Sequence, residues 1–210
     1  MSIPREFLEG CKQMGLQPSA LQLQQLETYV SLLRQWQKTY NLISSSTLDD
    51  IWVRHILDCA QLVPHIKSHV KVLDIGSGAG LPAVVLAILS EAEITACERL
   101  GKRVQFLRHV SREANLKEKL HVVQSDVLKL EGAFDIITAR AVADLSMLFE
   151  LSLHLAHEDT QWLLLKGQDY KNEIAALPSE ICVTADVHRS ITSIGGVVLG
   201  LKVSHETRKR

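Results

Sequence analysis

The sequence predicts an α/β fold of the Rossmann-like type, a seven-stranded, mostly parallel sheet with an N-terminal helical extension. Two observations lead to this fold class. After Val70, short β-rich runs alternate with amphipathic helical segments, which is the pattern of a parallel sheet covered by helices on both faces. Over the first 65 residues or so, the pattern is helical. We therefore expect a helical extension over residues 1–65 and a sheet domain over residues 66–210.

Seven short apolar runs are the expected strands: Val70–Ile75, Ile94–Cys97, Leu120–Gln124, Phe134–Ala139, Gln161–Lys166, Ile181–His188 and Gly196–Val203. The expected helices after Val70 are Pro82–Ser90, Gly101–Ala114, Met147–Leu155 and Tyr170–Ala176. The last strand has no helix of useful length before it, so we expect it to enter the sheet antiparallel.

Two helices are expected in the extension. Apolar residues recur at helical spacing within Ser19–Tyr40, and Gln22 completes a capping box at the start of this helix. Thr47 with Asp50 predicts the cap of a second helix, which Pro64 ends.

A glycine-rich turn follows the first strand, in the segment Asp74–Gly80. Such a turn has no side chains between a ligand and the backbone amides. A dinucleotide-binding G-x-G-x-x-G loop would need glycine where Leu81 stands, and the Gly-Lys-Ser/Thr of a P-loop is absent. The remaining pattern, D-x-G-x-G-x-G, is typical of S-adenosylmethionine-dependent methyltransferases. Glu98 ends the second strand, where an acidic side chain accepts hydrogen bonds from a ribose; the alternative is a turn that binds nothing.

Composition narrows the class of protein. The 23 Lys and Arg nearly balance the 24 Asp and Glu, so RNA contact would need a local basic patch. The four cysteines lie far apart and no Cys-x-x-Cys pair occurs, so we expect no metal. The N-terminus lacks the apolar core of a signal peptide, and the longest apolar run, Leu81–Leu89, is about half of a membrane span. We expect a soluble cytoplasmic protein.

Missing motifs bear on the methyl acceptor. No cysteine follows a proline, as a nucleophile for carbon-5 methylation usually does, and the segment 138–144 lacks the Asn/Asp-Pro-Pro-aromatic motif of amine methylation. An oxygen acceptor would need a general base. A ring nitrogen with a free lone pair, such as guanine N7, needs no deprotonation, and the shortage of obvious bases fits that acceptor.

Several segments occur in an order that resembles one known family: Asn41–Leu42, Val53–Asp58, Leu73–Pro82, Gly101–Arg108, Arg140–Ala141 and Leu165–Gln168. Together they are similar to the bacterial small-subunit ribosomal RNA guanine-N7 methyltransferases, the glucose-inhibited division protein B family. The resemblance implies a class I methyltransferase fold, S-adenosylmethionine as donor, and N7 of a guanine in the 530 loop of 16S rRNA as acceptor. It also implies 16S rRNA or the small ribosomal subunit as partner, and we expect a monomer.

The resemblance also implies site residues. Expected cofactor contacts, taken from the loop itself and from the family, are Asp74, Gly76, Gly78, Gly80, Leu81, Glu98, Val127, Leu128 and Arg140. This chain departs from the family at Cys59, where the family usually has serine, and at Ile194–Val197, where an Arg-His pair usually stands.

Basic residues supply the expected RNA contacts: Arg54, Lys102, Arg103, Arg108, Arg112 and Lys166, with the tail Arg208–Arg210. A solvated helix face is the alternative for the cluster around Lys102, and a surface ion pair with Asp58 is the alternative for Arg54. No catalytic residue is assigned outright; the candidates are Arg140, Lys166 and His55.

Two other functions stay open at this point. The balanced charge tolerates a small-molecule methyltransferase. A binding module that holds S-adenosylmethionine without turnover would also carry the glycine loop.

Overall fold

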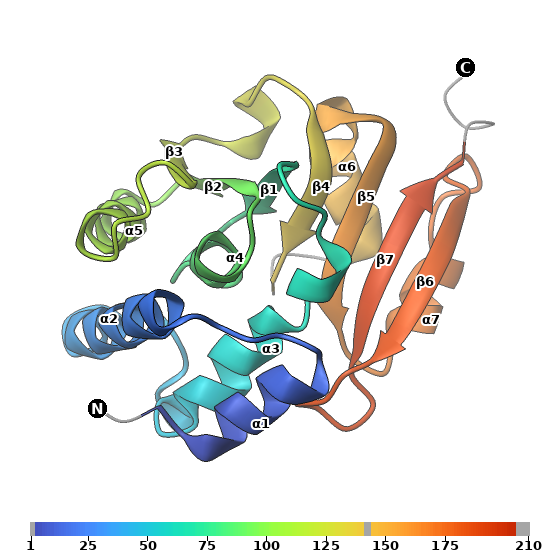
Figure 1. The fold of residues 1–210 in the computed structure, drawn as a ribbon. Helices are drawn as coiled ribbons and strands as arrows, with labels where there is room; N and C mark the ends of the chain where they lie inside the picture. Colours follow the sequence, from blue (N-terminus) through green and yellow to red (C-terminus); the bar gives the residue numbers. More distant parts are fainter. Residues whose placement is uncertain (1–2, 141–143, 205–210) are drawn as a thin grey trace.

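One seven-stranded sheet, in the order β3-β2-β1-β4-β5-β7-β6, organises the computed structural model, which describes residues 3–140 and 144–204 (Figure 1). The strands are β1 Lys71–Ile75, β2 Glu93–Glu98, β3 Leu120–Gln124, β4 Phe134–Ala139, β5 Ala156–Lys166, β6 Val183–Arg189 and β7 Val197–Val203. The first five strands pair in parallel, and β7 pairs antiparallel with both β5 and β6. The predicted fold class and the antiparallel direction of the last strand are confirmed.

Helices cover both faces of the sheet (Figure 1). They are α1 Arg5–Gln13, α2 Ala20–Gln37, α3 Asp58–Ala60, α4 Ala83–Leu89, α5 Gly101–Glu113, α6 Leu145–Ser152 and α7 Tyr170–Ala175. A π-helical segment, η2 Trp52–Leu57, runs into α3, and short 3₁₀ turns lie at η1 Ser45–Thr47, η3 Val63–His65, η4 Val127–Lys129 and η5 Leu153–Leu155.

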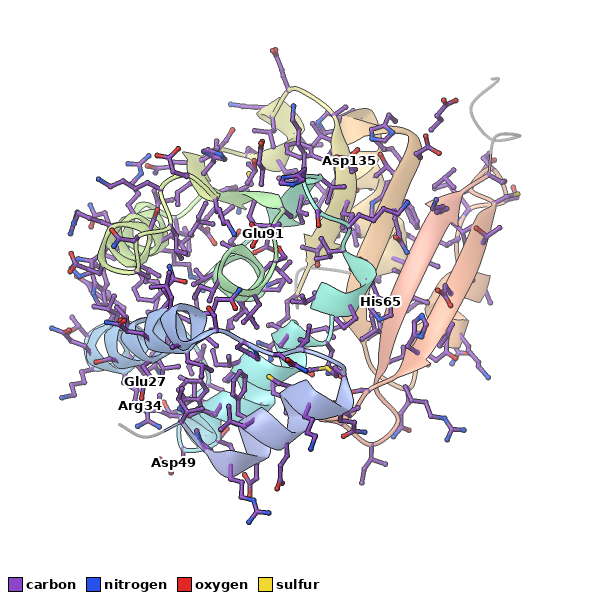
Figure 2. The ribbon with its side chains drawn as sticks, viewed as in Figure 1. Glu27, Arg34, Asp49, His65, Glu91 and Asp135 are labelled. Carbon is purple, nitrogen blue, oxygen red and sulfur yellow. The ribbon has the colours of Figure 1, made fainter. Side chains whose placement is uncertain are left out.

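Alternating side chains of the buried strands feed two hydrophobic cores. Val72 belongs to the core beneath α4 and α5, whereas its neighbour Leu73 belongs to the core beneath α6. This follows from the two-residue period of a strand, which sends successive side chains to opposite faces. Asp135 lies at the amino end of β4 and accepts the Lys71 amide at 2.7 Å (Figure 2), so the carboxyl ends of β1 and β4 lie at the other edge of the sheet.

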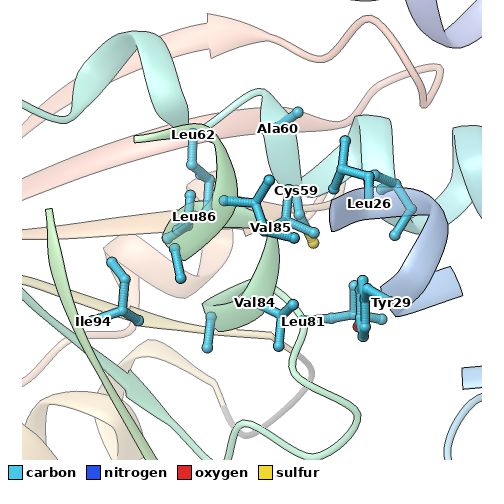
Figure 3. Close-up of a cluster of buried hydrophobic side chains, with 14 of the residues drawn as sticks. Leu26, Tyr29, Cys59, Ala60, Leu62, Leu81, Val84, Val85, Leu86 and Ile94 are labelled. Atoms are coloured by element: carbon cyan, nitrogen blue, oxygen red, sulfur yellow. The ribbon is translucent and has the colours of Figure 1, made fainter. Parts of the chain in front are cut away.

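The helical extension packs on the α4 side and shares its core. Leu26 and Tyr29 of α2 belong to the same buried cluster as Leu81 and Val84, and Figure 3 shows Tyr29 beside Leu81. The Tyr29 hydroxyl donates to the Ala79 carbonyl at 2.7 Å, which ties the extension to the glycine turn. Because the two parts share a core, the boundary at residue 65 marks a change of sequence pattern, and the division into domains stays a prediction.

The expected start of the second helix of the extension is wrong, while the first cap is right. Ser19 and Gln22, the third residue of α2, form the predicted capping box of this helix. Thr47 caps no helix, because its hydroxyl donates to the Ser44 carbonyl within the 3₁₀ turn η1. Helix α1 was not expected. Its buried residues, Phe7, Gly10 and Cys11, lie at helical spacing, but they cover little more than one turn of a short helix.

No helix in the described ranges is long and apolar enough to cross a bilayer. Within the same ranges, no group of three or more His, Cys, Asp or Glu side chains is arranged to hold a metal ion.

Candidate functional site

The carboxyl ends of the central strands converge where the strand order reverses. Parallel register places Ile75 at the end of β1 beside Cys97 of β2 on one side and Ala139 of β4 on the other. In open parallel sheets this edge, at the point of reversal, is where ligands bind. A cavity of about 650 Å³ opens there, a size typical of small-molecule sites.

The glycine turn after β1 borders this cavity and needs glycine for its backbone. Gly76, Gly78 and Gly80 have φ angles of 65°, 54° and 86°, in the left-handed region that L-residues with a side chain adopt at a cost. The Gly76 amide donates to the carbonyl of Cys97 at 2.8 Å, and the Gly78 amide donates to Glu98 Oε2 at 2.9 Å. The turn is therefore fastened to the end of β2.

Gly78 and Gly80 have different surroundings. A Cβ on Gly78 would meet no atom closer than 3.6 Å, and Gly78 lines the cavity. A Cβ on Gly80 would lie 2.5 Å from Val84 Cγ2 and 2.9 Å from Leu107 Cδ2, inside the core. Gly80 packs against the core and does not line the cavity, and its expected contact with a cofactor stays a prediction.

Glu98 is 5% exposed and holds the turn and the start of α5 together. Its Oε2 accepts the Gly78 amide, and its Oε1 accepts the Leu100 amide at 2.9 Å. Arg103 Nη1 lies 3.7 Å from Oε2. A carboxylate has about four lone-pair positions, so these contacts leave acceptor capacity on the cavity side.

Asp74 lies beneath the turn and does not line the cavity. It is fully buried, its Oδ2 accepts the Ala83 amide at 3.3 Å, and its Oδ1 has no partner among the described residues. Burial raises the pKa of Asp74 to about 7, against the lowering by hydrogen bonds from Ser77 and Ala83. Asp74 thus holds the start of α4 from beneath the turn, and its expected contact with a cofactor stays a prediction.

The loop after β3 forms another wall of the cavity. Asp126 and Val127 line it, together with Arg99, whose Nη1 lies 3.6 Å from Asp126 Oδ2. Leu128 does not line it: its side chain is 59% exposed, and its amide donates to Asp126 Oδ1 at 3.2 Å.

Arg140 follows β4 and lines the cavity on the side of the extension. Its Nη2 donates to the Arg54 carbonyl at 3.0 Å and lies 3.6 Å from Asp58 Oδ2, and its Nη1 lies 3.9 Å from Cys59 Sγ. Asp58 thus pairs with Arg140, and the expected alternative, a surface pair between Asp58 and the exposed Arg54 side chain, is not what the structure has. Cys59, the departure from the family pattern, contacts this arginine directly.

His55 also lines the cavity, and its hydrogen bonds define its tautomer. Thr47 has one hydroxyl hydrogen, which it donates to the Ser44 carbonyl at 2.8 Å. The contact of 2.8 Å between Thr47 Oγ1 and His55 Nε2 therefore needs a proton on Nε2, which leaves a lone pair on Nδ1. Nδ1 is buried and has no partner among the described residues. Burial, reinforced by Arg140 and Arg54, lowers the pKa of His55 to about 4, so the ring is neutral at pH 7.

Of the remaining expected RNA and catalytic residues in the described ranges, all except Arg103 lie outside the cavity lining. Lys166 Nζ pairs with Glu173 Oε2 at 2.6 Å, and the Lys166 side chain is only 13% exposed. Lys102, Arg108 and Arg112 are exposed on α5. Arg103, expected to contact RNA, instead lines the cavity beside Glu98. The tail at 208–210 lies outside the described residues.

One wall of the cavity was missed from the sequence. Leu42, Ile43 and Ser44 line it, and Gln37 holds this loop in place. The Gln37 side chain accepts the Leu42 and Ile43 amides at 2.8 and 3.0 Å and donates to the Ile43 carbonyl at 2.9 Å. Gln37 lies on the buried stripe of α2, and a polar residue on an apolar stripe was the available clue.

Comparison with known proteins places this geometry in a family. The family model described as rRNA small subunit methyltransferase G matches residues 22–199. A ribosomal RNA small subunit methyltransferase G of Pseudomonas paraeruginosa is 38% identical over 184 residues, covering 86% of both chains. The protein of the same name from Shigella flexneri is 38% identical over 188 residues, covering 88% of this chain and 90% of that one.

Solved structures at lower identity share the fold. A ribosomal protein L11 methylase from Lactobacillus delbrueckii subsp. bulgaricus superposes with a TM-score of 0.57 at 16% identity, covering 72% of this chain and 79% of that chain. Pyrococcus horikoshii TYW2, in complex with MeSAdo, gives a TM-score of 0.56 at 16% identity, covering 77% of this chain and 64% of that chain. These likenesses show the fold, and the family match, which covers most of the sequence, shows that this chain belongs to the ribosomal RNA small subunit methyltransferase G family.

Proposed function

We propose that this protein transfers a methyl group from S-adenosylmethionine to N7 of one guanine in the 530 loop of 16S rRNA. The observation that carries the proposal is the cavity at the carboxyl ends of β1 and β2, walled by a left-handed glycine turn and a buried glutamate, in a chain that belongs to a small-subunit rRNA methyltransferase family. We propose further that it acts in the cytoplasm as a monomer, on free 16S rRNA or on the small subunit.

The residues around the cavity fit S-adenosylmethionine. The open space at Gly78 admits a ligand against the backbone, and Glu98 keeps acceptor capacity suited to ribose hydroxyls. Val127, in the loop after β3 that lines the cavity, offers an apolar contact for the adenine, with Leu128 as the second expected contact. When bound, S-adenosylmethionine supplies an activated methyl group on a sulfonium, so the protein must chiefly align the acceptor.

The charges of the cavity suit this chemistry. Arg99, Arg103 and Arg140 each lie within 3.7 Å of a carboxylate, so every arginine that lines the cavity in the described part of the chain has a compensating charge. Methyl transfer to N7 removes a positive charge from sulfur and places one on the guanine. A site whose own charges are paired opposes neither state.

The acid–base groups favour an acceptor that carries a free lone pair. Burial raises the pKa of Cys97 to about 11 and that of Cys59 to about 12, so neither thiol is an active nucleophile near pH 7. His55, with its pKa near 4, is a weak general base. Guanine N7 needs neither a nucleophile nor a base, which supports it as the acceptor.

The test is methyl transfer with labelled cofactor. Small subunits and 16S rRNA from a strain that lacks the activity are incubated with labelled S-adenosylmethionine, and the modified nucleotide is mapped by mass spectrometry. We expect one 7-methylguanine in the 530 loop, with incorporation strongly reduced in Glu98→Gln and unchanged in the exposed control Glu131→Gln. Binding of the cofactor without any incorporation into rRNA would instead favour a small-molecule methyltransferase or a non-catalytic binding module.

A further inference from the structure

The tip of the β6–β7 hairpin is fastened to the helical extension by hydrogen bonds. Gln61, 4% exposed, accepts the Ile191 amide on its Oε1 at 2.7 Å. Its Nε2 lies within donating distance of Thr192 Oγ1, at 3.0 Å, and of Ser190 Oγ, at 3.2 Å. Gln61 and Ser190 are 129 positions apart in the chain, so these hydrogen bonds join the C-terminal hairpin to the helical extension.

These contacts continue to the cavity through one carboxylate. Thr192 Oγ1 donates to Asp58 Oδ1 at 2.5 Å, and Asp58 Oδ2 lies 3.6 Å from Arg140 Nη2. The direction of the chain is consistent throughout: the Gln61 amide donates to the Thr192 hydroxyl, which donates to the carboxylate that faces the guanidinium. Thr192 itself does not line the cavity.

The position of Arg140 depends on this chain of contacts. Asp58 supplies the one ion pair that Arg140 makes in the described part of the protein. The other contacts of its guanidinium are the Arg54 carbonyl and Cys59 Sγ, and a thiol is a weak acceptor. A long arginine side chain adopts many rotamers unless its head group is held. The Thr192 hydroxyl, at 2.5 Å, and Gln61 Nε2, at 3.2 Å, both donate to Asp58 Oδ1, and the Thr192 contact is the shorter of the two. Fixing this oxygen leaves Asp58 Oδ2 directed at Arg140.

We propose that Thr192, acting through Asp58, is a positioning residue that holds Arg140 at the cavity wall for methyl transfer. This inference rests on the proposed function, because it assigns Arg140 a role in the rRNA reaction. It makes the β6–β7 hairpin part of the active site although no residue of the hairpin borders the cavity.

The first experiment removes only the hydroxyl. Thr192→Val keeps the branched shape, and we expect its kcat with small subunits to fall roughly ten- to hundredfold, the scale of a misaligned reacting geometry. Affinity for S-adenosylmethionine, measured by calorimetry, is expected to change much less than kcat, because the contacts of Glu98 with the glycine turn and with the start of α5 do not involve Thr192. Thr192→Ser, which keeps the hydroxyl, is expected to restore kcat. Ser193→Ala, on the exposed side of the same tip, is the matched control and is expected to behave as wild type.

The second experiment distinguishes positioning from a general structural role. In an Arg140→Gln background, followed under single-turnover conditions, Thr192→Val is expected to have no further effect, because the group that it positions is absent. An equal fall in both backgrounds would overturn the proposal, as would a wild-type kcat for Thr192→Val.

A readout without turnover completes the test. In protein labelled with ¹⁵N-arginine, the guanidinium signals of Arg140 are assigned by their loss in Arg140→Gln. We expect them to shift or broaden in Thr192→Val and to stay unchanged in Ser193→Ala; unchanged signals in both would refute the positioning. If the wild-type protein methylates no rRNA, the proposed function fails, whereas this measurement still decides whether Thr192 holds Arg140.

Discussion

Two glycines in the same turn should respond differently to the same substitution: Gly80→Ala should mainly lose stability, and Gly78→Ala should mainly lose ligand affinity. In Gly80→Ala, the new Cβ would lie 2.5 Å from Val84 Cγ2 and 2.9 Å from Leu107 Cδ2. Overpacking of this kind costs about 1–3 kcal/mol, and a left-handed alanine costs about 1–2 kcal/mol more. We therefore expect Gly80→Ala to lose about 2–5 kcal/mol of unfolding free energy, a large part of the 5–15 kcal/mol that is typical of a domain.

Gly78→Ala carries the backbone cost without the clash. Its Cβ would meet Gly76 O at 3.6 Å and Arg103 Nη1 at 3.9 Å, which are ordinary contacts. The loss of unfolding free energy should then be only about 1–2 kcal/mol. Because Gly78 borders the cavity, its new methyl group competes with a bound ligand, and we expect affinity for S-adenosylmethionine to fall about tenfold or more, equivalent to roughly 1.4 kcal/mol.

Urea unfolding and titration calorimetry together measure both effects. Gly15→Ala is the matched control for backbone strain alone, since Gly15 has a φ of 74° with no atom within 4 Å of its Cβ position. Its stability loss should equal that of Gly78→Ala, with unchanged ligand affinity. The reasoning is refuted if Gly80→Ala unfolds like Gly15→Ala, or if Gly78→Ala binds S-adenosylmethionine as tightly as the wild-type protein does.

Three further predictions concern single charged or titratable residues. The folded pKa of Asp74, about 7, lies above its unfolded value of about 3.9, so the stability that Asp74 contributes is present below pH ~4 and is lost as pH rises to 7. Over this pH window, the unfolding free energy of Asp74→Asn, measured in urea, should rise relative to that of wild type by on the order of 4 kcal/mol. Parallel pH profiles of the two proteins would contradict this. For His55, ¹⁵N NMR should report the neutral Nε2–H tautomer at pH 6, and an imidazolium at that pH would show the assignment to be wrong. Arg112→Glu, on the exposed face of α5, should raise the KM for small subunits several-fold and lower its salt dependence while sparing cofactor affinity; equal loss of both would remove this face from RNA recognition.

The sheet could be predicted from sequence because its strands are local patterns. The expected end of β1 at Ile75 and the whole of β3 and β4 match the structure, since short runs rich in apolar residues mark them in the sequence. β5 begins at Ala156, five residues before the expected start at Gln161. Its first half includes exposed polar side chains, Glu158 and Asp159, which hide a strand from any apolar pattern.

The parts of the site within one loop were also predictable, and the parts assembled from distant segments were not. Gly78 follows β1 and Glu98 ends β2, so the parallel topology alone places them at one edge. The contact of Thr192 with Asp58 spans 134 positions, and no local pattern encodes it. Gly80 fitted the motif, yet its role depends on the distance to Leu107, which only packing reveals.

The three arginine–carboxylate pairs around the cavity explain how a nearly neutral protein can build a charged active site. The nitrogen–oxygen distances are 3.6 Å for Arg99 with Asp126, 3.7 Å for Arg103 with Glu98 and 3.6 Å for Arg140. These separations exceed those of direct charge-assisted hydrogen bonds, so each carboxylate keeps room for another donor. Ligand hydroxyls can then bind Glu98 without breaking a strong ion pair, while the arginines remain compensated. Pairs held at this separation therefore cost a ligand less to rearrange than tight, bidentate pairs would.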